Sequence, residues 1–150
     1  MMKIRSVLLA SMAAMVVACA HPPVAPPVAR QDCPGSSCDL AVHVTGDIAA
    51  GTAVIVPVPD LRVARGNLDP VLRWKLMTPG YEFRAGSIVP KAGSEADWAN
   101  QCRILVEQRD LVLAKNANSR QVTMNYAIHV WHVQTNRKVS LDPAIFNDGP

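Results

Sequence analysis

The chain has 150 residues, of which 49% are hydrophobic and 18% are charged, and its formal net charge is +3. This length predicts one domain plus a targeting segment. Removing Lys3 and Arg5, which precede an apolar run near the amino terminus, from the 15 basic residues leaves 13 against 12 acidic residues. A net charge this close to zero gives no overall electrostatic attraction to nucleic acid or to an anionic membrane surface. We therefore expect no nucleic-acid partner.

Residues 1–18 have the organisation of a secretory signal peptide. Lys3 and Arg5 form a basic start, and residues 7–17 form an apolar run without charge. The run is about half as long as a membrane-spanning helix, which needs roughly 20 residues. We therefore predict a cleaved leader over residues 1–18 rather than an anchor helix.

The leader ends in Val16-Val17-Ala18-Cys19, which resembles the lipobox of bacterial lipoproteins. The resemblance implies lipid attachment to the Cys19 thiol, cleavage before Cys19 and acylation of the new amino terminus. Lipidation requires a cysteine because the thiolate is the nucleophile that accepts the lipid. Several acyl chains would form a stable membrane anchor. The residue after Cys19 is Ala20 rather than an aspartate, and by this resemblance it favours sorting to the outer membrane over retention at the inner membrane.

A second interpretation of the same residues remains open. Ala18-Cys19-Ala20 also fits the A-x-A site of ordinary secreted proteins, and cleavage before His21 would release a soluble periplasmic protein. We favour lipidation because cysteine is an uncommon residue and lies at the one position where a lipobox requires it.

Residues 19–37 are predicted to form a tether between the lipid anchor and a globular domain. Residues 21–32 contain two Pro-Pro pairs, which are typical of an extended, polyproline-like spacer. A recognition peptide for an aromatic groove is the alternative, but one proline-rich tract does not justify it. The globular domain is then predicted to occupy residues 38–150.

Short alternating stretches separated by turns dominate the globular part. The longest is 122–133, in which Tyr126, Ile128 and Val130 share one face, and we take it as a central strand. The stretch 71–77 alternates so that Trp74 is predicted to face the core. Ser94 and Asp97 predict one capped helical turn with Trp98 over the core. The remaining predicted strands are 39–45, 52–58, 61–64, 102–108, 111–115 and 138–141, the last as a hairpin partner of the central strand, and shorter extended stretches lie at 81–83 and 88–89.

Seven to nine such strands predict an all-β fold, specifically an antiparallel β-sandwich. Trp74 and the later Tyr126-x-Ile128 resemble the core tryptophan and the tyrosine pattern of immunoglobulin-like domains. A group of small proteobacterial β-sandwich proteins is also similar over residues 71–147, through Trp74-x-Leu76-x-x-x-Gly80-Tyr81-x-Phe83, Tyr126-x-Ile128-x-Val130 and Leu141-Asp142-Pro143. That group has no assigned activity, so the resemblance implies a fold and no function.

Three cysteines remain after Cys19, namely Cys33, Cys38 and Cys102. An exported chain reaches an oxidising compartment, so we expect one disulfide and one leftover thiol. We favour Cys38–Cys102, because each residue opens a predicted strand and the bridge would staple the sandwich, with Cys33 as the reactive thiol. The alternative is Cys33–Cys38, which leaves Cys102 as a buried thiol. Four residues separate Cys33 from Cys38, so the pair does not form a redox CxxC motif.

No motif points to catalysis, to a metal or to another cofactor. G-x-S-x-G, S-x-x-K and H-E-x-x-H are absent, and the glycines are isolated. His129 and His132 are three apart in one predicted strand and therefore point to opposite faces. We expect a non-enzymatic, lipid-anchored envelope protein that binds another envelope protein without a cofactor. The alternative is a secreted soluble domain that binds a small ligand or a metal through loops at one end.

Overall fold

The computed structural model describes residues 29–56 and 58–150. Within these ranges the chain forms thirteen strands and one short helix, which confirms the predicted all-β class. The predicted signal peptide, Cys19 and the first ten residues of the predicted tether lie outside the described residues. In the part that the structure describes, no helix is long and apolar enough to cross a membrane.

The helix α1 spans Glu95–Gln101. In chain order the strands are β1 (Arg30–Cys33), β2 (Ser37–Val42), β3 (Val44–Thr45), β4 (Val54–Ile55), β5 (Asp60–Val63), β6 (Val71–Leu76), β7 (Tyr81–Glu82), β8 (Ile88–Pro90), β9 (Cys102–Glu107), β10 (Leu111–Asn116), β11 (Gln121–His132), β12 (Lys138–Leu141) and β13 (Ala144–Asp148).

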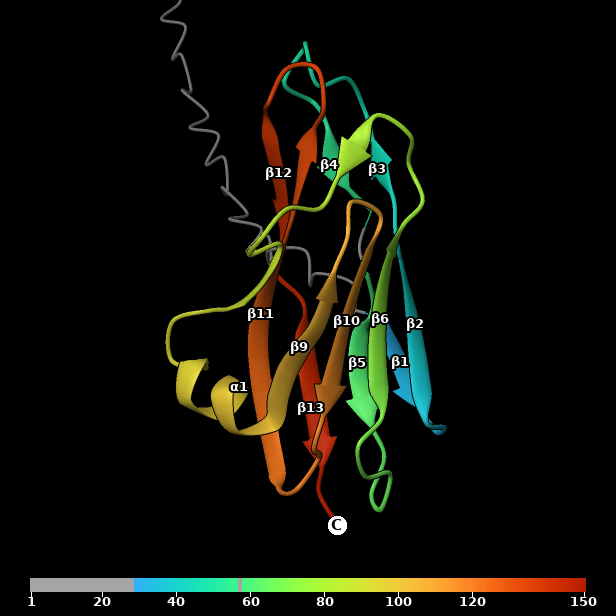
Figure 1. The fold of residues 1–150 in the computed structure, drawn as a ribbon, viewed down its shortest axis with the longest axis vertical. Helices are drawn as coiled ribbons and strands as arrows, with labels where there is room; N and C mark the ends of the chain where they lie inside the picture. Colours follow the sequence, from blue (N-terminus) through green and yellow to red (C-terminus); the bar gives the residue numbers. More distant parts are fainter. Residues whose placement is uncertain (1–28, 57) are drawn as a thin grey trace, which may run out of the picture.

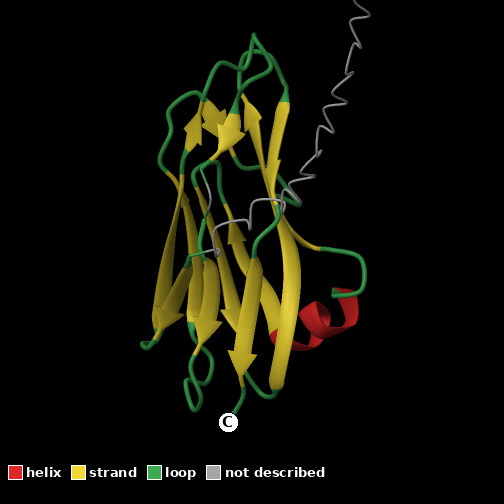
Figure 2. Cartoon of the chain, turned by 180° about the vertical axis from the view of Figure 1, so that it is seen from behind, coloured by secondary structure: helices red, strands yellow, loops and turns green. Residues whose placement is uncertain are grey.

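Two layers of sheet make up most of the domain (Figure 1). A four-stranded sheet in the order β2-β6-β10-β9 lies over a larger sheet in the order β1-β5-β13-β11-β12, in which β7 and β8 also pair with β11. The predicted antiparallel arrangement is wrong in part, because β1 with β5, β5 with β13, and β2 with β6 are parallel pairs. The view from behind shows the larger sheet in front, with α1 beside the long β11 (Figure 2).

The strand β11 is the longest in the described chain and confirms the predicted central strand. Its first half pairs with β13 and its second half with β12, both antiparallel. The predicted hairpin between residues 138–141 and the central strand is therefore confirmed. Met124, Tyr126, Ile128 and Val130 are completely buried, as their shared face predicted.

Trp74 lies at the centre of the core between the two layers. It is completely buried, whereas its neighbours Arg73 and Lys75 on β6 are exposed, so the predicted face assignment is confirmed. The indole Nε1–H donates a hydrogen bond to the Tyr126 hydroxyl over 3.1 Å, and the two rings meet edge to face with centroids 5.7 Å apart. This contact joins β6 of one sheet to β11 of the other, so each sheet covers the apolar face of its partner.

Two strands lie where none was predicted. β1 occupies Arg30–Cys33, inside the region assigned to the tether, and pairs with β5. β13 follows Pro143 and pairs with both β5 and β11. Both strands have partners far away in the chain, and such non-local pairing stabilises residues whose local pattern is weak.

The helix α1 is longer than the single predicted turn, and its amino terminus is capped differently. The Ser94 hydroxyl makes no capping bond and instead accepts the backbone N–H of Asn125 over 3.0 Å. Asp97, which was expected to complete the cap, forms an ion pair with Arg120. Trp98 is buried as predicted and lies with its ring centroid 5.7 Å from that of Tyr126.

Candidate binding site

The cysteines do not pair as we favoured. The structure pairs Cys33 with Cys38, whose Cα atoms are 5.5 Å apart, and leaves Cys102 as a buried free thiol. The predicted Cys38–Cys102 bridge is wrong because Cys38 is on β2 and Cys102 is on β9, at opposite edges of the four-stranded sheet. Three strand spacings amount to roughly 14 Å, whereas a disulfide needs Cα atoms within about 7 Å. Cys33 is therefore not the reactive thiol, and burial raises the pKa of Cys102 to about 12.

The histidines of β11 take part in local hydrogen bonds. His129 Nδ1 lies 2.7 Å from the Ser140 hydroxyl, and His132 Nδ1 lies 3.0 Å from the Thr135 hydroxyl. Partial burial, and then the charge of Lys138, lower the pKa of His129. Among the described residues, no group of three or more His, Cys, Asp and Glu side chains is placed to hold a metal ion.

Glu82 on β7 belongs to a second cluster of charged groups. Its carboxylate accepts hydrogen bonds from Arg84 Nε over 2.8 Å and from Arg109 Nε over 2.7 Å. The hydrogen bond from Arg84, more than that from Arg109, holds the pKa of Glu82 below its ordinary value. Both carboxylate oxygens of Glu82 already accept hydrogen bonds from arginines. We therefore assign Glu82 a structural role in holding β7 in place rather than a catalytic role.

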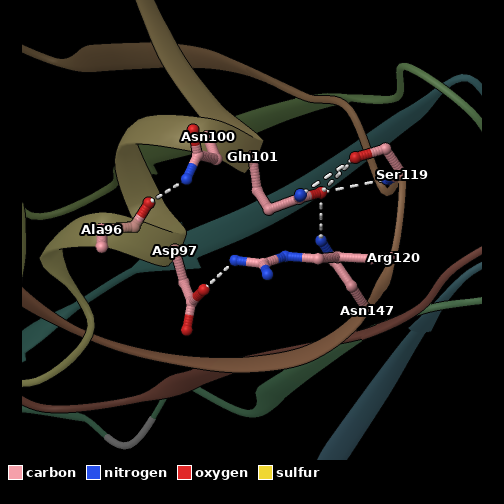
Figure 3. A network of polar contacts seen from close by, with 7 residues as sticks. All are labelled: Ala96, Asp97, Asn100, Gln101, Ser119, Arg120 and Asn147. Carbon is pink, nitrogen blue, oxygen red and sulfur yellow. Dashed lines mark hydrogen bonds and ion pairs between the residues drawn. The ribbon is translucent and has the colours of Figure 1, made fainter.

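The end of the domain at which the carboxyl terminus lies is closed by buried amide side chains. Gln101, Asn116, Asn118 and Asn147 are all at most 3% exposed. Asn116 and Asn147 donate to each other through their side-chain amides, over 2.8 and 3.0 Å. Gln101 Nε2 donates to the Ser119 hydroxyl over 3.0 Å, and its Oε1 accepts the Ser119 N–H over 3.0 Å (Figure 3). A buried network whose members all have partners rigidifies this end of the fold.

The same network holds α1 in place beside β9. Asp97 pairs with Arg120 from the turn that precedes β11, and the Asn100 amide donates to the Ala96 carbonyl over 2.8 Å (Figure 3). Gln101 is the last residue of α1 and Cys102 is the first residue of β9, so no loop separates the two elements. The last turn of α1 therefore forms a fixed wall next to the start of β9.

A pocket of about 240 Å³ opens at this wall. Its lining includes the charged residues Asp69, Arg103 and Lys115 and the amide residues Asn100 and Gln101. Arg103 on β9 and Lys115 on β10 are direct cross-strand partners. Lys115 Nζ lies 3.2 Å from an Asp69 carboxylate oxygen, whereas Arg103 forms no ion pair with any described residue.

The outward face of the four-stranded sheet borders this pocket and combines apolar with cationic side chains. We call it the leucine–cation face, and it comprises Leu105, Val106, Leu111 and Leu113 together with Arg73, Lys75, Arg103 and Lys115. Leu113 lies between Arg73 on one side and Val106 on the other, and Leu111 lies next to Lys75. Leu105 is 43% exposed. The exposed acidic residues of these four strands are Asp39, which pairs with Arg73, and Glu107, whose carboxylate accepts the backbone N–H of Gly86 over 3.1 Å.

A second hollow, of about 460 Å³, lies at the junction of β12 and β13. Two carboxylates in its lining are already used within the fold. Asp60 accepts the backbone N–H of Ala144 over 2.9 Å, and Asp142 pairs with Lys91 over 2.7 Å. We therefore take the pocket lined by Arg103 and Lys115 as the candidate site.

The chain matches no model of a known protein family, and a search of curated proteins finds no match to it.

Sequence reasoning missed the leucine–cation face because the chain as a whole is almost neutral. Its signal was present in the alternation of β6 and β10, where Arg73 and Lys75 share one side of one strand and Leu111 and Leu113 share one side of the other. Only the register of the two strands shows that these four residues lie on the same surface.

Proposed function

We propose that the chain is a lipid-anchored protein of the bacterial outer membrane whose all-β domain binds another envelope protein and has no catalytic activity. The resemblance of Val16-Val17-Ala18-Cys19 to a lipobox supports the anchor. The observation that carries the binding role is the leucine–cation face, on which Leu105 is exposed and Val106, Leu111 and Leu113 are half-buried. Exposed apolar side chains grouped among polar residues are typical of a protein–protein interaction site.

The position of the leucines within the sheet supports the binding role. A sheet face turned to solvent ordinarily carries polar residues. Leu111 and Leu113 are on β10, which has β6 on one side and β9 on the other, so they lie inside the face rather than at its edge. The surrounding cations favour a partner surface with an apolar centre and an acidic rim, because complementary charge adds specificity and speeds association.

The fold that presents this face is, in our proposal, a variant of the immunoglobulin-like β-sandwich. Support comes from the contact between Trp74 and Tyr126, the two residues on which the sequence resemblance rests. The parallel pairing of β1 and β2 with later strands distinguishes the variant from an antiparallel sandwich.

Replacement of Cys19 by alanine is expected to release the protein from the membrane. The wild-type protein should be found in detergent extracts of membranes, and its intact mass should correspond to a chain that starts at Cys19 and carries acyl groups. Cys19→Ala removes the thiol that accepts the lipid, so the variant should carry no lipid mass. The matched control is Cys102→Ala, because this buried thiol lies in the folded domain and should not affect lipidation. A wild-type chain that starts at His21 without lipid mass would contradict the anchor and favour the secreted, ligand-binding alternative.

The binding role predicts that a partner is captured from one outer face of the domain and not from the other. A photo-crosslinking amino acid at position 113 lies inside the leucine–cation face, whereas one at position 123 lies on the exposed side of β11 in the other sheet. In intact cells, we expect position 113 to yield a discrete adduct with a second protein and position 123 to yield little. Equal yields from both positions, or no adduct from position 113, would refute the proposed surface.

A further inference from the structure

We infer that the pocket between α1 and β9 binds a single oxyanion group, either a phosphate or a carboxylate, through Arg103 and Lys115. The inference deepens the proposed binding function and rests on it in one respect. The pocket borders the leucine–cation face, so an acidic partner seated on that face would present a charged group to Arg103.

Two like charges lie side by side at this pocket. Arg103 and Lys115 are directly opposite each other on neighbouring antiparallel strands, an arrangement that destabilises a sheet. Asp69 compensates one of the two charges through its ion pair with Lys115. No described carboxylate compensates Arg103, so a bound anion would remove a repulsion that the fold leaves in place.

The pocket is small and its wall is rigid. At about 240 Å³ the pocket is smaller than the pockets that enclose drug-sized ligands, so it fits a small group better than a large one. Its wall is fixed, because Gln101 forms hydrogen bonds with Ser119 and Asn147 and α1 is held through the ion pair of Asp97 with Arg120. A site that is already rigid loses little conformational entropy when it binds.

Arg103 and Lys115 carry hydrogen-bond donors that suit an oxyanion. The planar guanidinium of Arg103 can donate two parallel hydrogen bonds to one carboxylate or phosphate, while the Lys115 ammonium acts as a point charge from the next strand. Each of the two amide residues in the lining uses one of its two side-chain N–H groups within the fold, Asn100 with Ala96 and Gln101 with Ser119. An incoming anion would compete with Asp69 for Lys115 only, and that ion pair is exposed and therefore weak.

The experiment uses the full chain purified in non-ionic detergent, titrated calorimetrically with inorganic phosphate or with acetate at an ionic strength held constant with chloride. Arg103→Gln is compared with Arg65→Gln, which removes an exposed cation that does not line the pocket, lies outside the leucine–cation face and has no ion pair among the described residues. We expect saturable binding of at least one anion, weakened by about tenfold in Arg103→Gln because charge-assisted hydrogen bonds contribute that much. Arg65→Gln should change the affinity for the anion by no more than about twofold. The preferred anion identifies the group as phosphate or carboxylate.

A second readout does not depend on finding the right anion. Without added oxyanion and at low salt, Arg103→Gln should unfold at a higher temperature than the wild type, because the repulsion between Arg103 and Lys115 is removed, and added salt should abolish the difference. A lower unfolding temperature, no saturable binding of either anion, or equal weakening in both variants would overturn the inference. The proposed function fails on separate grounds, namely missing lipid at Cys19 or missing cross-links at position 113.

Discussion

Trp74→Ala is expected to lower the free energy of unfolding by about 3–5 kcal/mol, as large-to-small replacements of buried aromatic residues do. Trp74 is completely buried, and its ring contacts Tyr126 of the opposite sheet. The substitution would create a cavity between the two layers and would also remove the hydrogen bond from the indole to the Tyr126 hydroxyl. Chemical denaturation followed by circular dichroism measures the effect.

Two further variants separate the contributions to this loss. Tyr126→Phe keeps the ring but leaves the buried Trp74 Nε1–H without an acceptor, and it should cost about 1–3 kcal/mol. Trp131→Ala removes a tryptophan of the same central strand that is only half-buried. It should cost about 1 kcal/mol, as is usual for a typical substitution. Equal losses for Trp74→Ala and Trp131→Ala would show that the contact between Trp74 and Tyr126 does not form the centre of the core.

Asn116→Ala is expected to destabilise the domain by about 2–5 kcal/mol, because each buried polar group left without a partner costs roughly 1–3 kcal/mol. The Asn116 amide exchanges two hydrogen bonds with the Asn147 amide. Its Oδ1 also accepts the backbone N–H of Asn118 over 3.0 Å. The substitution would therefore leave the side-chain carbonyl of Asn147 and the backbone N–H of Asn118 buried without these partners.

The matched control for Asn116→Ala is Asn100→Ala. Asn100 is an exposed residue of α1 whose amide bonds only to the carbonyl one turn earlier. Its replacement should change the free energy of unfolding by no more than about 0.5 kcal/mol, as surface substitutions usually do. If the two asparagine variants were equally stable, the buried amide network would not be what closes this end of the domain.

Much of the β-structure could be predicted from the sequence, because its signal is local. In β11 and β6, apolar residues alternate with polar residues over six to twelve positions, and this period of two places one set of side chains on the buried face. The alternation predicted the all-β class, the central strand, its hairpin with β12 and the burial of Trp74. The motif that ends at Cys19 is likewise local, and the anchor that it predicts awaits the mass measurement.

The tertiary structure decided the features that depend on which strands become neighbours. Cys38 is the second residue of β2 and Cys102 is the first residue of β9, but β6 and β10 lie between those strands, so the disulfide forms with Cys33 instead. β13 is central in its sheet because β5 and β11 pair with it, and neither partner is adjacent to it in the chain.

The candidate site also depends on which strands become neighbours. Arg103 and Lys115 are twelve positions apart in the sequence, and each alone is an ordinary exposed cation. The register of β9 against β10 places them directly opposite each other beside the end of α1. Sequence alternation determines which face of a strand a side chain occupies, whereas long-range hydrogen bonding between strands determines what lies next to it.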